Sequence, residues 1–223
     1  MTKLALAVVS GGIDSVTLAY LLKSEGYSLH LLSFDYGQRH RKELACAQLA
    51  AERLAAQYSQ LDLTSVGQHL TGSALTDDIA VPSGHYAEEN MRVTVVPNRN
   101  AIMLSVAYGV AVAQNAELVA TGVHAGDHFI YPDCRPRFIN AFDLMQSLAV
   151  EGFGHPQLRL YAPFVNLGKH DIVALGHRLN VPYQDTWSCY QGGQYHCGQC
   201  GTCVERQEAF ALAGVADPTR YQG

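Results

Sequence analysis

Continuous apolar runs and helical spacings alternate along the first part of the chain. Residues 4–9 form an uninterrupted apolar run that ends in Ser-Gly-Gly, as in a parallel strand covered on both faces. A helical pattern follows at once, with Val16, Ala19 and Leu22 on one side, and it stops near Gly26. The pattern therefore predicts a buried strand followed directly by a helix.

The same alternation continues through the next forty residues or so. It predicts a strand, an alanine-rich helix and a third strand, at residues 28–34, 41–58 and 60–64. The helical pattern has one face of small and apolar side chains that runs from Leu44 to Tyr58. Strands and helices that alternate with short connections are typical of the α/β class, here a doubly wound parallel sheet.

The rest of the chain divides into a long irregular segment, further sheet elements and a cysteine-rich end. Residues 65–97 lack clear periodicity, and a segment of this length in a compact enzyme is more often a lid or binding loop than a slack linker. Beyond it the pattern predicts helices and strands at residues 100–114, 118–122, 137–148, 159–161 and 167–179. We expect a main domain over residues 1–182 and a small appendage over 183–223, with a last helix from about Val204.

Composition excludes several classes of protein. Of the 223 residues, 48% are apolar and 16% charged, so the chain can bury a core and is not disordered. A net charge of −5 argues against binding long nucleic acid. The apolar run at 4–9 is too short for a signal peptide, and the uncharged stretch at 101–116 falls short of the roughly 20 apolar residues that span a bilayer. We therefore expect a soluble, cytoplasmic protein that does not act on membranes or nucleic acid.

A glycine-containing turn between the first strand and helix is the first candidate for chemistry. Its six residues are Ser10, Gly11, Gly12, Ile13, Asp14 and Ser15. Backbone amides converge at such a helix N-terminus and favour a phosphate, and two glycines let it approach closely. The serine hydroxyls add donors, and the Asp14 carboxylate can cap the helix or hold Mg²⁺. A tight turn with an ordinary N-cap accounts for the same residues.

The four clustered cysteines are the second candidate. Cys189, Cys197, Cys200 and Cys203 lie within fifteen residues, with glycines between them. Four thiolates without an open position favour one structural Zn²⁺ per chain. An iron–sulfur cluster also takes four thiolates, and replacement of one thiolate by His196 is a minor alternative. Two disulfides conflict with the expected reducing compartment.

The turn and four further strings resemble a known family. Ser-Gly-Gly-x-Asp-Ser after the first strand is the signature of the N-type ATP pyrophosphatase superfamily, whose adenine nucleotide alpha hydrolase-like members adenylate a carbonyl oxygen. The chain further resembles the 7-cyano-7-deazaguanine synthase family of queuosine biosynthesis, from Ala5 to about Phe210. The strings that carry this resemblance are FDYGQRH at 34–40, VPNRN at 96–100, YPDCR at 131–135 and SCY at 188–190.

Two positions depart from the pattern of that family. Phe129-Ile130 stands where Ser-Gly is expected, and Asn98 stands where glycine is common. Both departures fall near expected pocket walls, so they bear on substrate contact more than on the class of reaction.

Charged side chains that follow strands or begin helices are the remaining site candidates. Because the carboxyl ends of parallel strands meet at one edge of a sheet, these charges are expected to converge there. The expected catalytic residues are Asp14, Arg99, Asp133, Arg135 and Lys169. The nucleotide is expected on the glycine turn, with Arg39 beside it. Alternatives for three of them are a solvated helix start for Arg39, an ion pair near a helix for Arg135 and an ordinary surface position for Lys169.

The resemblance implies a reaction and its substrates. They are ATP with Mg²⁺, 7-carboxy-7-deazaguanine and ammonia, and the acid becomes a nitrile through adenylation, an amide and a second adenylation. The family also implies a homodimer. Alternatives are another amidotransferase or tRNA-modifying ligase of the superfamily, and a nucleotide-binding regulatory module without turnover.

Overall fold

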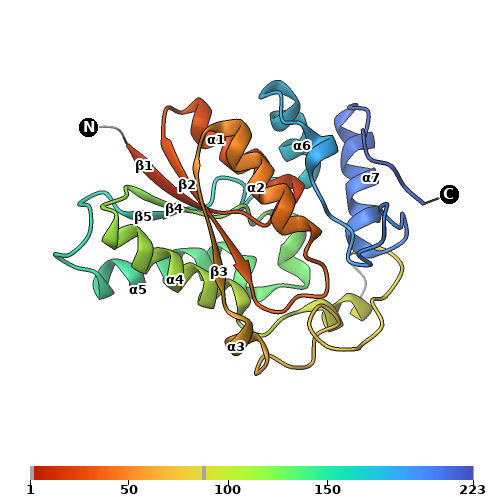
Figure 1. The fold of residues 1–223 in the computed structure, drawn as a ribbon, viewed down its shortest axis with the longest axis horizontal. Helices are drawn as coiled ribbons and strands as arrows, with labels where there is room; N and C mark the ends of the chain where they lie inside the picture. Colours follow the sequence, from red (N-terminus) through yellow and green to blue (C-terminus); the bar gives the residue numbers. More distant parts are fainter. Residues whose placement is uncertain (1–2, 87–88, 223) are drawn as a thin grey trace.

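One sheet of five parallel strands forms the centre of the protein (Figure 1). The computed structural model describes residues 3–86 and 89–222. The strands are β1 (Leu4–Val8), β2 (Ser28–Asp35), β3 (Gln57–Asp62), β4 (Leu118–Ala120) and β5 (Arg159–Tyr161). Their spatial order is β3-β2-β1-β4-β5, and each neighbouring pair is parallel. The chain thus builds one half of the sheet outward from β1 and then returns to β4, which confirms the doubly wound class.

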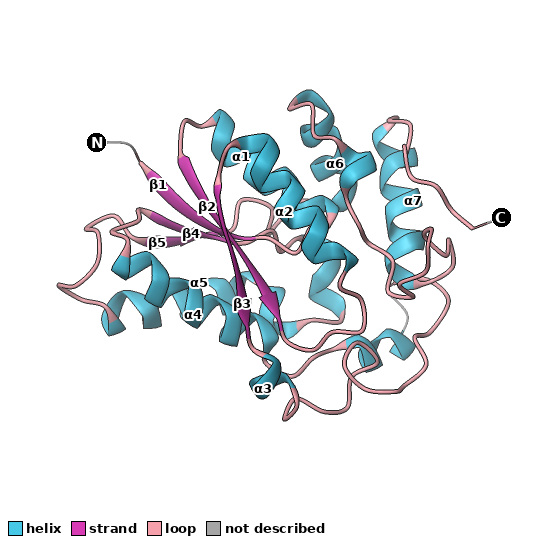
Figure 2. Cartoon of the chain, viewed as in Figure 1, coloured by secondary structure: helices cyan, strands magenta, loops and turns pink. Residues whose placement is uncertain are grey.

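Helices cover both faces of this sheet (Figure 2). One face carries α1 (Ile13–Ser24), α2 (Lys42–Leu54) and α6 (Lys169–Arg178), and α7 (Gly201–Ala213) packs against α6. The other face carries α4 (Arg99–Ala113) and α5 (Pro136–Ala149). No helix in the described ranges has both the length and the apolar character that crossing a membrane requires.

Strand β1 shows why the central run is apolar on both sides. Ala5 and Ala7 belong to the core cluster beneath α1 and α2, whereas Leu6 belongs to the cluster beneath α4. Successive side chains of a strand point to opposite faces, so a strand covered twice has no polar position. The three side chains are fully buried.

The predicted end of the second helix and the predicted bounds of the third strand are wrong by several residues. The helix ends at Leu54, and Ala55 turns the chain in the left-handed region with φ of 47°. Tyr58, expected on the helix, pairs with Leu31 inside β3. Because β3 is an edge strand with little buried surface, its sequence lacks the apolar run that would mark its start.

The irregular segment and the last helix also differ from expectation. Short helices interrupt the segment at 65–97, namely α3 (Thr64–Gly67) and the 3₁₀ helix η1 (Glu89–Thr94). Further 3₁₀ helices are η2 (Ala125–Phe129), η3 (Pro132–Cys134) and η4 (Tyr183–Asp185). Helix α7 begins at Gly201, three residues before the expected start, so Cys203 is helical.

Gly11 allows the turn after β1 to pass directly against α2. Its φ of +92° lies in the left-handed region, and a Cβ there would overlap the Glu43 carbonyl oxygen and approach the Ala47 nitrogen to 2.9 Å. Both contacts are with backbone atoms, which cannot rotate away. This glycine therefore sets the distance between the turn and α2.

Replacing Gly11 with alanine is expected to destabilise the protein much more than replacing Gly26. Gly26 has a similar φ of +86°, but no atom of the described residues lies within 4 Å of an added Cβ. Gly26→Ala should therefore cost only the left-handed strain of about 1–2 kcal/mol. Gly11→Ala carries the same strain and the steric overlap. Denaturant unfolding of both variants measures the difference, and equal losses would contradict the proposed contact.

Candidate nucleotide site and metal centre

A cavity of about 270 Å³ opens at the carboxyl end of the sheet, next to β1. The turn after β1 forms one wall, and the first residues of α4, α6 and α7 form others. This is the position at which open α/β sheets bind ligands, because the strand order reverses between β1 and β4. The predicted site residues that line it are Ser10, Gly12, Ile13, Asp14, Ser15, Arg99, Lys169 and Cys189.

Hydroxyl groups hold the turn after β1 in place. The Ser10 amide donates to Ser15 Oγ at 3.2 Å, and Ser15 Oγ donates to the Gly12 carbonyl at 3.2 Å. Gly12 is the N-cap of α1, and no side chain of the described residues caps that helix. The alternative in which a serine or aspartate side chain caps the helix is therefore wrong. The first backbone N–H groups of α1 are available to donate hydrogen bonds to a ligand.

Lys169, the first residue of α6, joins the turn to the C-terminal segment. Its ammonium lies 3.4 Å from Asp14 Oδ2 and forms an ion pair with Glu205 of α7. Burial alone would lower the pKa of Lys169, but the Asp14 and Glu205 carboxylates outweigh it and raise that pKa well above its ordinary value. The cavity therefore holds a permanent positive charge beside the turn.

His124 lies at the centre of the same cluster. Its Nδ1 accepts a hydrogen bond from the Gly126 amide at 3.1 Å, so in the neutral ring Nε2 carries the hydrogen. Nε2 lies 3.8 Å from Asp14 Oδ2, 3.6 Å from Asp127 Oδ2 and 3.9 Å from Glu205 Oε1. Within the described residues, the buried Oδ1 of Asp14 has no hydrogen-bond partner. Three carboxylates against one ammonium leave this end of the cavity negative.

Arg99 supplies the positive charge of the opposite wall. Its Nη1 donates to the Tyr36 hydroxyl at 3.5 Å, and Tyr131 and Tyr190 lie nearby in the cavity wall. Burial by itself lowers the pKa of Arg99, but the surrounding tyrosines raise it above its ordinary value. Over residues 3–86 and 89–222, Arg99 forms no salt bridge. A charged guanidinium without a carboxylate partner favours the binding of an anionic ligand.

Glu43 and Glu205 are cavity residues that sequence reasoning missed. Glu43 follows the second strand in the first turn of a helix, the same signal that selected Arg39. Glu205 follows Cys203 by two residues on α7. The cysteine pattern of this region indicates only a metal-binding segment and therefore did not single out Glu205. Burial raises the pKa of Glu43 to about 7, and Arg99 and Gln38 oppose that rise.

Three predicted charged residues do not line the cavity but form hydrogen bonds with backbone atoms of nearby segments. Arg39 donates to the Ile79 carbonyl at 2.8 Å, and Arg135 Nε donates to the His128 carbonyl at 2.8 Å. Asp133 Oδ2 accepts the Asn100 amide at 3.1 Å, at the start of α4. These contacts connect the loops around the cavity.

The two departures from the family pattern have structural explanations. Asn98 has φ of 55°, in the left-handed region that glycine prefers and asparagine tolerates, so the backbone before α4 is retained. Phe129 is 58% exposed, whereas Ile130 is buried and lines the cavity. Of Phe129 and Ile130, only Ile130 therefore lies where it could contact a ligand in the cavity.

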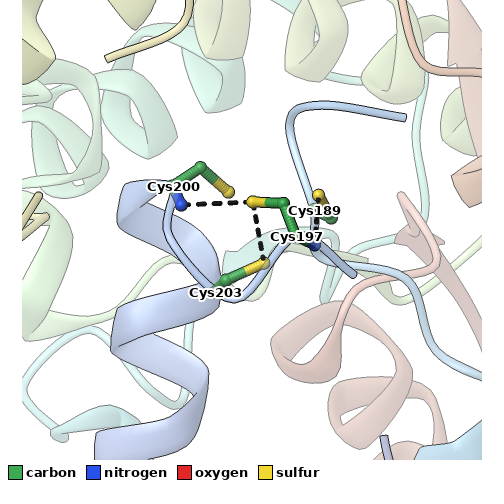
Figure 3. Close-up of side chains that lie close together, drawn as sticks. All are labelled: Cys189, Cys197, Cys200 and Cys203. Carbon is green, nitrogen blue, oxygen red and sulfur yellow. Dashed lines mark hydrogen bonds between the residues drawn. The ribbon is translucent and has the colours of Figure 1, made fainter. Parts of the chain in front are cut away.

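The four cysteines converge on one point (Figure 3). Their sulfur atoms lie within 4.8 Å of one another, and Cys197 Sγ is 3.9 Å from Cys203 Sγ. A tetrahedral ion with metal–sulfur bonds of about 2.3 Å separates its sulfurs by about 3.8 Å. The cluster could therefore hold one metal ion. An iron–sulfur cluster places irons and sulfides between its cysteines and needs a wider cage.

Backbone amides around these sulfurs favour thiolates. Cys189 Sγ accepts the amides of Gln191 and Cys197, both at 3.3 Å, and Cys197 Sγ accepts the Cys200 amide at 3.2 Å. All six cysteines are free, so the disulfide alternative is wrong. His196 is not part of the group of ligand atoms that lie within 4.8 Å of one another, and its Nε2 accepts the Ser188 amide at 3.1 Å.

A parallel doubly wound sheet with an uncapped Ser-Gly-Gly-x-Asp-Ser turn after β1 defines the N-type ATP pyrophosphatase fold. The family described as Queuosine biosynthesis protein QueC matches residues 4–214, and the chain belongs to this family.

Two similar proteins and one similar solved structure agree with this family and fold. It is 59% identical over 218 residues to 7-cyano-7-deazaguanine synthase 1 of Mesorhizobium japonicum, which covers 98% of this chain and 93% of that protein. It is 61% identical over 217 residues to 7-cyano-7-deazaguanine synthase of Brucella anthropi, at 97% and 93% coverage. The structure of NMN synthetase from Francisella tularensis shares the fold, with 19% identity, a TM-score of 0.53 and coverage of 96% and 78%. The relatives are synthases, so this is a family of enzymes.

Loss of one cysteine of the cluster is expected to remove the metal and loosen the C-terminal segment. Wild-type protein should contain about one ion per chain by elemental analysis. Cys197→Ser should lose most of it and melt several degrees lower, because structural metal binding contributes to folding. Cys46→Ser, on α2 outside the cluster, is the control and should retain the metal. Full metal content in Cys197→Ser would contradict this assignment.

Proposed function

We propose that the protein converts 7-carboxy-7-deazaguanine and ammonia into 7-cyano-7-deazaguanine with ATP, as a ligase that forms carbon–nitrogen bonds. The observation that carries this proposal is the uncapped turn at Ser10 to Ser15, which lines a cavity beside the charged Lys169. Identity near 60% over nearly full length to proteins named for this product supports the choice of substrate.

The turn is proposed to bind the phosphates of ATP. A carboxylate is a poor electrophile because oxide or hydroxide would have to leave, and transfer of AMP to its oxygen provides a good leaving group. The amides at the start of α1 and the Ser10 and Ser15 hydroxyls hold the phosphates. The Lys169 ammonium stabilises the negative charge that develops as pyrophosphate departs from the α-phosphorus.

The opposite wall is proposed to hold the acid. Arg99, with the hydroxyl of Tyr36, binds and orients the substrate carboxylate toward the α-phosphate. Ammonia displaces AMP from the acyl adenylate and leaves the amide. A second ATP then adenylates the amide oxygen. This oxygen leaves as part of AMP, the nitrogen loses its two protons, and the nitrile forms. Both rounds act on one carbon, so one cavity serves both.

Two metals are proposed, with different functions. Mg²⁺ accompanies ATP and neutralises phosphate charge, and the Asp14 carboxylate beside the turn, whose Oδ1 is unpartnered in the described chain, would hold it. Zn²⁺ in the four-cysteine cluster is structural, because all four positions are thiolates and none is left for a substrate.

The remaining predicted residues are assigned supporting functions. Gly11 permits the approach of the turn to α2, and Arg39, Asp133 and Arg135 hold the loops that surround the cavity. They act on the reaction by positioning the walls.

We further infer a cytoplasmic homodimer that acts on small molecules. The net charge of −5 disfavours nucleic acid. Exposed apolar side chains on α5, among them Leu144 and Leu148, provide a surface for association of two copies.

The test is an assay with ATP, 7-carboxy-7-deazaguanine and ammonia that follows the nitrile, AMP and pyrophosphate. The wild type should form all three, and Lys169→Met should reduce turnover by about 10²-fold or more because a buried charge at the phosphates is lost. Lys23→Met, in the last turn of α1, is the matched control and should retain activity. If the wild type consumes no ATP with this acid, the proposal is wrong.

A further inference from the structure

Two opposite charges in the cavity wall are not paired with each other. Glu43 of α2 and Arg99 of α4 both line the cavity, and neither forms a salt bridge within the described ranges of the chain. By contrast, Asp14 and Glu205 at the turn are paired with Lys169. Buried charges cost free energy unless they are satisfied. A ligand that is anionic at one end and donates hydrogen bonds at the other would satisfy both.

We propose that Glu43 recognises the amidine edge of the deazaguanine base by accepting hydrogen bonds from its ring N–H and its exocyclic amine. Arg99 faces the carboxylate at the other end of the same molecule. This inference rests on the proposed function and identifies the residue that selects a guanine-type base for it.

Gln38 holds the Glu43 carboxylate in a fixed orientation. Its amide nitrogen donates to Glu43 Oε1 at 3.3 Å and to the Phe34 carbonyl at 3.1 Å, and its oxygen accepts the Tyr36 amide at 2.9 Å. Gln38 is only 5% exposed, so it cannot turn away. Glu43 Oε2 accepts no hydrogen bond from the described residues and is available to a ligand.

The ionisation of Glu43 agrees with this function. Burial raises its pKa to about 7, although the Arg99 charge and the hydrogen bond from Gln38 both favour the carboxylate. Two N–H donors from a base would supply further stabilisation. Hydrogen bonds to a charged acceptor are stronger than neutral ones.

The same carboxylate distinguishes the two heterocycles that must share the cavity. A guanine-type edge presents two adjacent N–H donors, which match the two oxygens of a carboxylate. The edge of adenine presents one donor beside a ring nitrogen whose lone pair would face the carboxylate. Glu43 therefore favours the deazaguanine at this wall and directs the adenine of ATP elsewhere.

The experiment compares two ligands by calorimetry on the full chain. The ligands are 7-carboxy-7-deazaguanine and its analogue with hydrogen in place of the exocyclic amine. The wild type should prefer the first by roughly 10- to 100-fold, the range expected for a hydrogen bond to a charged group. Glu43→Gln should lose most of this preference, and its affinity for ATP should stay unchanged.

Two further variants serve as controls. Glu52→Gln lies on the same helix, where Glu52 accepts a hydrogen bond from Gln48 at the surface, and it should keep the full preference. Glu43→Asp retains the charge and should restore part of the preference that Glu43→Gln loses. This rescue separates recognition from a general effect on folding, which thermal unfolding of each variant also monitors.

Three outcomes would overturn the inference. Nitrile formation by the wild type with an unchanged ligand preference in Glu43→Gln would overturn it and leave the proposed function intact. Weaker ATP binding in Glu43→Gln with normal affinity for the acid would assign Glu43 to the nucleotide instead. No binding of the acid by the wild type would overturn both proposals.

Discussion

The Lys169 ammonium, shared by carboxylates from the two ends of the chain, is the interaction on which the site depends. Asp14 belongs to the turn after the first strand and Glu205 to the last helix, and neither contact exists until α1, α6 and α7 have packed together. An ammonium buried without these partners would cost several kcal/mol. The pairing therefore couples the position of the C-terminal helix to that of the turn after β1, which is proposed to bind phosphate. It also keeps a permanent positive charge at the place where phosphates are expected.

The segment that carries the cysteine cluster forms part of the cavity wall and is not structurally separate from the site. Ser188, Tyr190 and Thr202, which lie between the cysteines or beside them, line the cavity. The cluster also contacts the long irregular segment, since Ser83 forms a bridge with Cys200 and the Gly84 amide donates to the Gln199 carbonyl at 3.1 Å. A metal held by the four thiolates would thus order both the C-terminal wall and the segment that packs on it. Its contribution to the reaction would be indirect, through the shape of the cavity.

The charges of the cavity are divided between two ends. Lys169 is surrounded by carboxylates near the turn, while Arg99 is surrounded by tyrosines and lacks a carboxylate partner within the described chain. The first end suits a nucleotide with its cation, and the second suits an anionic oxygen of another substrate. An enzyme that joins two substrates through an adenylate needs both kinds of end in one enclosed space, because the reacting oxygen must reach the α-phosphorus without water.

Local sequence patterns were enough to predict the fold class and to single out the glycine-containing turn after β1 and the cysteine cluster. These patterns are buried runs that alternate with helical spacings, a six-residue motif, and four thiols close together. Local patterns misplaced the edge strand β3, whose polar sequence does not mark its start. They also could not separate Arg99 and Lys169, which line the cavity, from Arg39 and Arg135, which hold loops beside it. The direction of a side chain depends on which elements pack around it. For the same reason only the tertiary structure brought Glu43 and Glu205, 162 residues apart in the printed sequence, into one cavity.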